Sequence, residues 1–358
     1  MNENEILGFD PTSLSVFNEP EAQKPAGNPL IYKAQPSKSV SEDGVYRATI
    51  KVIYSPQNLK GSILEQQTYA MQDANGWFSA VSSLTNGDTK CPIFTAWKKC
   101  RYAEEGSTLK MQCEPKDKGG KALFDKRFAR YVTIQVMEDK NQPELVGKYL
   151  FWKLPKSIWD IINAKMNPSK ESGKASVPIM DFLFGRAIEL EVYPGPDDPK
   201  QPERKTRETK YIGEISDDVV SCTNPDGSPI LNDADQEVLE EYVEAMSKVW
   251  RTKDSETREG LLAKVNASEN TKELKKIYAK VLEQIKGFCP DLNKELGYKE
   301  WNADLTARVE AWINIVLSGN DPAVSNAVPN VLSTSELVAE GTTEVGFDDS
   351  EETDDLPF

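Results

Sequence analysis

The hydrophobic period of the chain changes part-way along its length, and this change limits the folds that are open to it. Between residues 45 and 215, several short stretches alternate branched or aromatic residues with polar ones, a pattern that predicts strands. These stretches are 45–54, 131–137, 147–154, 186–193 and 210–215. Beyond residue 232, apolar residues recur three and four positions apart, as on one face of a helix. The pattern therefore predicts an α+β protein.

The same pattern divides the chain into four regions. Residues 1–43 contain scattered prolines and predict an irregular N-terminal arm, and residues 44–232 hold the strands and one short helix at 157–166. Residues 233–318 predict a helical subdomain, with helices from 233 and at 261–265, 271–288 and 303–317. Residues 319–358 are acidic and poor in aromatic residues, which predicts disorder.

Composition excludes several classes of function. The chain has no histidine, which removes Ser-His-Asp and Cys-His catalysis and every metal site that needs imidazole. No carboxylate pair or glycine-rich phosphate loop stands out, so we expect a protein that is not an enzyme. Five cysteines without a framework spacing fit a reduced intracellular protein, and no apolar run is long enough to span a membrane.

Charge is distributed unevenly along the chain. The net charge is −15, but residues 309–358 carry eleven acidic residues and no Lys or Arg, which leaves −4 for the rest. Residues 90–174 carry eighteen Lys or Arg against ten Asp or Glu. A basic middle and an acidic end suggest a domain that binds a polyanion, followed by a solvated tail.

Three basic clusters in this middle region contain aromatic residues. Cations that follow phosphates and rings that stack on bases are the usual means of holding single-stranded nucleic acid. The candidate binding residues are Trp97, Lys98, Lys99, Arg101 and Tyr102; Lys126, Arg127, Arg130 and Tyr131; and Lys148, Trp152 and Lys153. In the third cluster, strand alternation places Tyr149 and Phe151 opposite Trp152, so at least one of these aromatic sets belongs to the core.

Two stretches of the chain resemble a known family. The first runs from Asp125-Lys126-Arg127 through Pro143-Glu144 and Gly147-Lys148 to Lys156 and the segment 157–163, which reads Ser-Ile-Trp-Asp-Ile-Ile-Asn. The second comprises Ser82-Ser83, Gly87-Asp88 and Cys91-Pro92. Both resemble the single-stranded DNA-binding (helix-destabilising) proteins of T-even phages, over roughly residues 45–267.

The resemblance implies an OB-fold β-barrel core with a small inserted subdomain at about 75–120, and a cleft between them for a few nucleotides. It assigns Lys126 and Arg127 to phosphate contacts, and Trp152, followed by Lys153, to the cleft aromatic. The family's zinc site of one His and three Cys is not preserved, because only Cys91 remains; Val81 and Phe94 occupy two of the other positions. We therefore expect no metal or other cofactor, with Val81, Ile93 and Phe94 filling the space.

The last residues suggest a second binding function. Asp354, Asp355, Leu356, Pro357 and Phe358 resemble the tip of bacterial single-stranded DNA-binding proteins, which docks partner enzymes. An apolar end can enter a pocket while its carboxylates meet basic residues around it. The same acidic residues could also occupy the basic region when DNA is absent, so that the tail and DNA would compete for it. The alternative interpretation is that the tail only keeps the protein in solution.

The sequence therefore predicts a phage single-stranded DNA-binding protein of replication, recombination and repair that recruits partner enzymes through its tail. Self-association on DNA stays an open alternative, because Lys33 and Lys38 of the arm are a weak substitute for the compact basic cluster of the family. The alternatives are a non-catalytic scaffold protein and a strand-annealing accessory factor. The expected location is the cytoplasm of the infected host bacterium.

Overall fold

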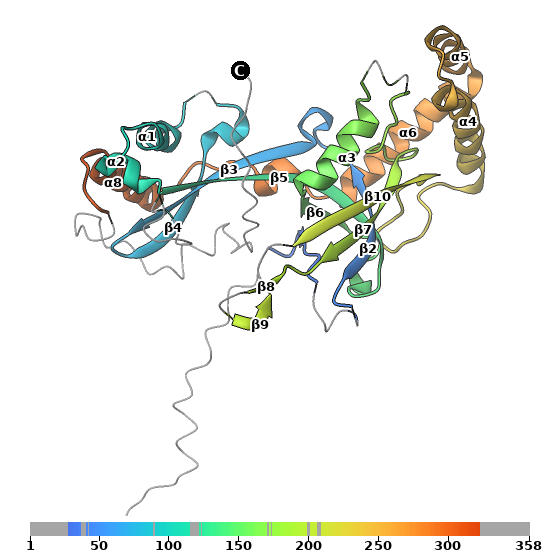
Figure 1. The fold of residues 1–358 in the computed structure, drawn as a ribbon. Helices are drawn as coiled ribbons and strands as arrows, with labels where there is room; N and C mark the ends of the chain where they lie inside the picture. The colour runs from blue at the N-terminus through green and yellow to red at the C-terminus, as the bar shows by residue number, and fades with distance from the viewer. Residues whose placement is uncertain are drawn as a thin grey trace, which may run out of the picture.

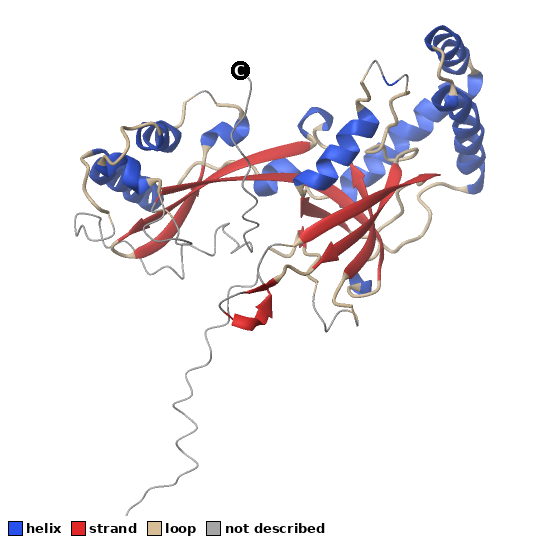
Figure 2. Cartoon of the chain, viewed as in Figure 1, coloured by secondary structure: helices blue, strands red, loops and turns tan. Residues whose placement is uncertain are grey.

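The computed structural model describes residues 28–36, 41, 43–88, 90–114, 122, 124–169, 172, 174–198, 201–205 and 209–322. These residues form two lobes joined by the long strands β3 and β5 (Figure 1). Figure 2 shows that both strands continue from one lobe into the other, which ties the lobes together by backbone hydrogen bonds.

The described strands end at residue 219, and helices alone follow them. The strands are β1 (Ile31–Tyr32), β2 (Tyr46–Ile53), β3 (Ile63–Asp73), β4 (Gly76–Val81), β5 (Phe124–Asp139), β6 (Tyr149–Lys153), β7 (Arg186–Tyr193), β8 (Asp197–Asp198), β9 (Gln201–Lys205) and β10 (Lys210–Val219). The helices are α1 (Pro92–Arg101), α2 (Thr108–Gln112), α3 (Lys156–Met166), α4 (Asp233–Arg251), α5 (Ser255–Ala267), α6 (Glu269–Phe288), α7 (Leu292–Leu296) and α8 (Ala303–Leu317).

The strands form a mixed sheet with the order β1-β6-β5-β2-β7-β10, while β3 pairs with β5 and β4 with β3. Within the described residues β1 pairs only with β6 and β10 only with β7, so the two edges do not meet. The predicted combination of sheet and helices is confirmed, but the predicted barrel is not closed. Helix α3 packs against β10 instead. The contact is close at Gly213 of β10, where an added Cβ atom would lie only 2.8 Å from the side chain of Ile158 on α3. The helix thus buries apolar surface without closure of the sheet.

We call one end of the molecule the large lobe: β1, β2, residues 131–139 of β5, β6, β7, β10 and α3. Its core contains the even-numbered residues Val132, Ile134 and Val136 of β5, packed with β2, β7 and α3. Part of the N-terminal arm belongs to this lobe, because Ile31–Tyr32 pairs with Phe151–Trp152 of β6. The arm was predicted to be irregular, but residues 31–32 form a strand. Residues 1–27, 37–40 and 42 of the arm lie outside the described residues.

The small lobe comprises residues 65–73 of β3, β4, residues 124–130 of β5, α1, α2 and α8. The predicted insertion at 75–120 thus omits three of its components: the β3 segment, the β5 segment and the distant helix α8. Trp312 of α8 donates a hydrogen bond to the carbonyl of Gln72 at 2.8 Å and packs edge-on against Phe124 at 4.6 Å between ring centroids. A helix from the end of the described chain therefore completes this core.

Residues 233–318 do not form a body of their own. Helices α4 and α6 pack together beside the large lobe, where they share a core with Ile53, Tyr149 and Phe182. Helix α7 then covers β3 and β5 through Leu292, and α8 lies on the small lobe. The predicted helices themselves are confirmed. Asn302 caps α8 by accepting a hydrogen bond from the backbone N–H of Leu305 at 2.7 Å.

A buried ion pair fixes α8 to the β3–β4 hairpin. The Arg308 guanidinium donates to both carboxylate oxygens of Asp73, at 2.8 and 2.9 Å, and lies 4.1 Å from the Phe78 ring centroid. Both side chains of the pair are at most 2% exposed.

In the described part of the chain, no helix combines the length and apolarity that a membrane crossing requires.

Replacement of Arg308 by Ala should strongly destabilise the small lobe, because it leaves the Asp73 carboxylate buried without its partner. Loss of one member of a buried pair costs about 3–5 kcal/mol of unfolding free energy, and urea denaturation followed by circular dichroism measures it. The matched control is Lys272→Ala, which removes an exposed ion pair with Glu269 on α6. Equal stability of the two variants would show that the Arg308–Asp73 pair does not hold the helix.

Candidate nucleic-acid interface

Helix α1 presents a basic and aromatic face to solvent. Pro92 occupies its first turn, and Ile93, Ala96, Trp97 and Cys100 form its buried face. The opposite face places Phe94, Lys98 and Tyr102 at successive intervals of four residues. Lys98, Lys99 and Arg101 lie in the last turn, where the helix dipole favours cations.

This face is hollowed by a shallow depression of about 540 Å³, lined by Phe94, Thr95, Lys98, Lys99 and Tyr102. Tyr102 is 70% exposed, more than any other large hydrophobic or aromatic side chain among the described residues. The depression lies along α1 itself. It provides apolar ring surface beside cations, the combination that stacked bases and their phosphates require.

Strand β5 extends this face through Lys126. The Nζ atom of Lys126 lies 5.0 Å from the ring centroid of Trp97 and 5.9 Å from that of Phe94, so the ammonium group sits against the aromatic side of α1. These two rings are themselves stacked, with centroids 6.4 Å apart and planes inclined by 16°.

Beyond α1, the same face of β5 carries Phe128 and Arg130, because strand residues two apart share a face. Phe128 is 37% exposed, and the Arg130 guanidinium lies 5.1 Å from its ring centroid. Arg130 also forms an ion pair with Glu65 on the neighbouring strand, at 3.0 Å. We call the combined set the α1–β5 surface: Phe94, Thr95, Lys98, Lys99, Tyr102, Lys126, Phe128 and Arg130.

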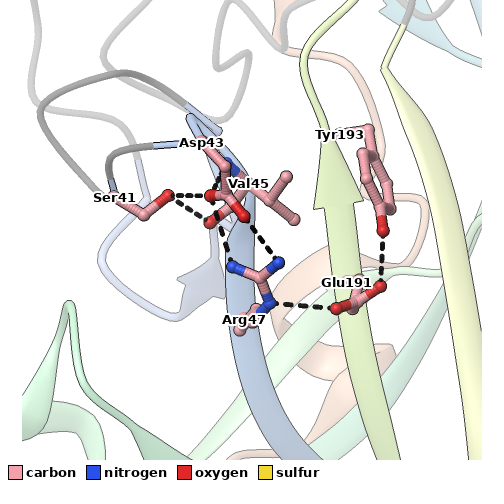
Figure 3. Close-up of polar contacts among 6 residues, drawn as sticks. All are labelled: Ser41, Asp43, Val45, Arg47, Glu191 and Tyr193. Carbon is pink, nitrogen blue, oxygen red and sulfur yellow. Dashed lines mark hydrogen bonds and ion pairs between the residues drawn. The ribbon is translucent and has the colours of Figure 1, made fainter.

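The cations of the α1–β5 surface are mostly free of carboxylates. No described acidic group lies within 4.0 Å of Lys98, Lys99 or Lys126. Arg47 on β2 shows the contrary case: it pairs with Asp43 at 2.7 Å and with Glu191 at 2.9 Å (Figure 3). The hydrogen bond from Arg47 is the main cause that holds the pKa of Asp43 below its usual value. Arg47 is exposed but already neutralised.

Three rings predicted to bind nucleic acid are core residues instead. Trp97, Tyr131 and Trp152 are only 8%, 5% and 3% exposed. Trp152 lies opposite Val132 and packs into the core of the large lobe, while Tyr131 packs among side chains under α7. Burial raises the pKa of Tyr131 to about 12. These predictions were wrong for this conformation, because local sequence does not show which strand face the neighbouring elements cover.

The basic residues of the second and third clusters are also separated. Arg127 follows Lys126 on β5, so its side chain points to the opposite face, where it pairs with Asp125 at 3.1 Å. Lys153 lies opposite Tyr131, near the junction of the lobes, whereas exposed Lys148 precedes β6 at its other end, beside Val136. Arg101 is exposed at the end of α1. The structure therefore gathers Lys98, Lys99 and Tyr102 of the first cluster with Lys126 and Arg130 of the second.

Besides Thr95, two aromatic residues of the α1–β5 surface were missed by the sequence prediction. Phe94 was expected to fill the space of a lost metal site, and Phe128 was not selected. The signals were present in both cases: Phe94 and Lys98 are four apart on a helix, and Phe128 lies between Lys126 and Arg130 at the strand period of two.

The described residues do not fit a zinc site of the kind that the resemblance implied. Cys91 and Cys100 are buried in the apolar core of the small lobe beside Ile93, and Phe94 packs against that core. No group of three or more Cys, Asp or Glu residues is placed to hold a metal ion in the part of the chain that the structure describes. The predicted partner-binding residues, Asp354 to Phe358, lie outside that part.

The comparisons with known proteins agree with this picture. No curated protein matches the chain. Residues 63–250, more than half of the chain, match the family described as gp32 DNA binding protein like. This range includes strand β3, the whole α1–β5 surface and helix α4 except for its last residue. The chain therefore belongs to the gp32-like family of DNA-binding proteins.

Proposed function

We propose that this chain binds single-stranded DNA along the α1–β5 surface and acts, without catalysis, in phage replication, recombination and repair inside the infected host cell. The observation that carries the proposal is that three lysines without a described carboxylate partner lie beside accessible rings on one face of the small lobe: Lys126 contacts Phe94, and Lys98 and Lys99 line the depression with Phe94 and Tyr102. Lys126 and Arg130 are four residues apart, roughly 13 Å along the strand. That length lets cations follow several phosphates while Phe128 meets a base between them.

Single strands suit this surface better than duplex DNA. Phe94, Tyr102 and Phe128 offer ring faces, and bases expose theirs only when they are unstacked from a complementary strand. The proposal also holds that the open sheet is a divergent OB fold, and that apolar packing rather than zinc maintains the small lobe.

We further propose that the acidic end of the chain recruits partner enzymes. Phe358 supplies an apolar group beside a terminal carboxylate, and the preceding acids suit a basic rim around a partner's pocket. The same acids repel DNA phosphates and compete for cations of the α1–β5 surface.

Removal of single lysines should weaken binding of oligo(dT) and reduce its dependence on salt. Lys98→Ala, Lys99→Ala and Lys126→Ala should each lower the slope of log affinity against log salt by about 0.7, because one counterion fewer is released. Fluorescence anisotropy with a labelled oligo(dT) at several salt concentrations measures the slope. Lys148→Ala, which removes an exposed lysine at the far end of β6, should leave it unchanged. A change of slope in Lys148→Ala, with none in the other three variants, would place the DNA path on the large lobe.

Loss of an exposed ring should weaken binding with little change in salt dependence. Phe128→Leu and Tyr102→Leu should each cost about 1–3 kcal/mol if the ring stacks on a base. The matched control is Trp77→Leu: Trp77 is 39% exposed in the same lobe, but it lies opposite Gln72 on the other face of the hairpin. Two results together would favour the scaffold alternative. Phe128→Leu and Tyr102→Leu would bind oligo(dT) with the same affinity as this control, and oligo(dT) would not quench tryptophan emission.

Deletion of Asp348 to Phe358 should tighten binding of oligo(dT) at low salt, since it removes acids that compete with phosphates. The gain should disappear at high salt, where screening suppresses the competition. The same titration with the shortened chain tests this. An unchanged affinity at every salt concentration would leave the tail with partner recruitment alone.

A further inference from the structure

The large lobe contains a pocket that the proposed DNA path does not use. Its volume is about 320 Å³, and it lies where the ends of α3 and α4 meet strands β7 and β10. Its lining includes Lys165, Arg186, Asp217, Trp250 and Arg251, together with the apolar side chain of Ile215. None of these residues belongs to the α1–β5 surface.

Arg186 is the unusual residue of this pocket. It is 7% exposed, and its guanidinium lies 5.1 Å from the ring centroid of Trp250. Its buried Nη1 atom has no hydrogen-bond acceptor among the described residues. Asp217 and Asp218 act on its charge from a distance, but neither forms an ion pair with it in the described structure. Burial is the main influence on its pKa, which it lowers.

The other two cations have ordinary explanations. Lys165 lies in the last turn of α3 and Arg251 in the last turn of α4, where the negative end of the helix dipole stabilises positive charge. Arg186 is the first residue of strand β7, so no helix dipole stabilises its charge. A buried guanidinium with an unused donor is costly unless an anion satisfies it, so Arg186 points to a missing ligand.

We propose that this pocket binds the phosphate group of a nucleotide. Arg186 would bind the phosphate oxygens with its planar fork of donors, and Lys165 and Arg251 would add charge at the rim. Three cations against one carboxylate leave an excess that suits a phosphate monoester better than a single carboxylate. Trp250 and Ile215 provide apolar surface for the sugar and base. The phosphate can come from a free nucleotide or from a DNA strand that reaches the large lobe.

Calorimetric titration of the full chain with thymidine monophosphate, inorganic phosphate and oligo(dT) tests this proposal. Thymidine monophosphate should bind wild type, and Arg186→Gln should weaken that binding at least tenfold. Arg186→Lys, which keeps the charge but loses the fork, should fall between them. The matched control is Lys248→Ala, which removes an exposed cation from α4 outside the pocket. Circular dichroism verifies that each variant is folded.

The remaining arms separate the sources of the phosphate and keep this site distinct from the DNA path. If oligo(dT) displaces thymidine monophosphate in an Arg186-dependent manner, the ligand is a strand; if it does not, the ligand is a free nucleotide. Lys98→Ala should not alter binding of thymidine monophosphate, whatever it does to oligo(dT). Equal binding by wild type and Arg186→Gln would overturn the proposal. The absence of nucleotide and phosphate binding would also overturn it. A third contrary result would be that a peptide ending in Leu-Pro-Phe is the only ligand whose binding depends on Arg186.

Discussion

Strand β5 is the element on which the rest of the structure depends. Its sixteen residues pair with β3 in one lobe and with β2 and β6 in the other, so a single run of hydrogen bonds sets how the lobes meet. Strand alternation then aligns side chains from both lobes on one face. That face is core at Val132 to Val136, open at Lys126 to Arg130, and core again at Phe124. The open interval lies between the cover of α3 and that of α1 and α8.

The C-terminal helices brace this arrangement from outside the sheet. The chain passes from α6 beside the large lobe, through α7 on β3 and β5, to α8 on the small lobe. Trp312 and Val309 supply apolar surface to a lobe that is small for an independent core, and Arg308 neutralises the buried Asp73 carboxylate. The family match ends at residue 250, so this brace comes from a segment that the match does not include.

The net charge of −15 conceals a separation of signs. On the α1–β5 surface, Lys98, Lys99 and Lys126 have no described carboxylate within 4.0 Å, whereas Arg47 is matched by two carboxylates. The Arg186 pocket adds a buried guanidinium whose Nη1 atom lacks an acceptor among the described residues. Cations that the surrounding groups leave unneutralised attract anions even when the whole chain is acidic.

Much of the fold follows from the sequence alone, because strand and helix periods are local properties. Strand 186–193 and helix 303–317 were predicted with their observed bounds. Motifs were also enough to identify the family. Which rings face solvent was not predictable: Trp152 and Phe128 both lie in basic stretches, yet α3 and its neighbours cover the first and leave the second open. Burial depends on elements far away in sequence, as the α8 contacts to β3 and β5 show. The sequence by itself therefore determined the elements and the family, whereas tertiary packing decided which of their residues remain free to bind.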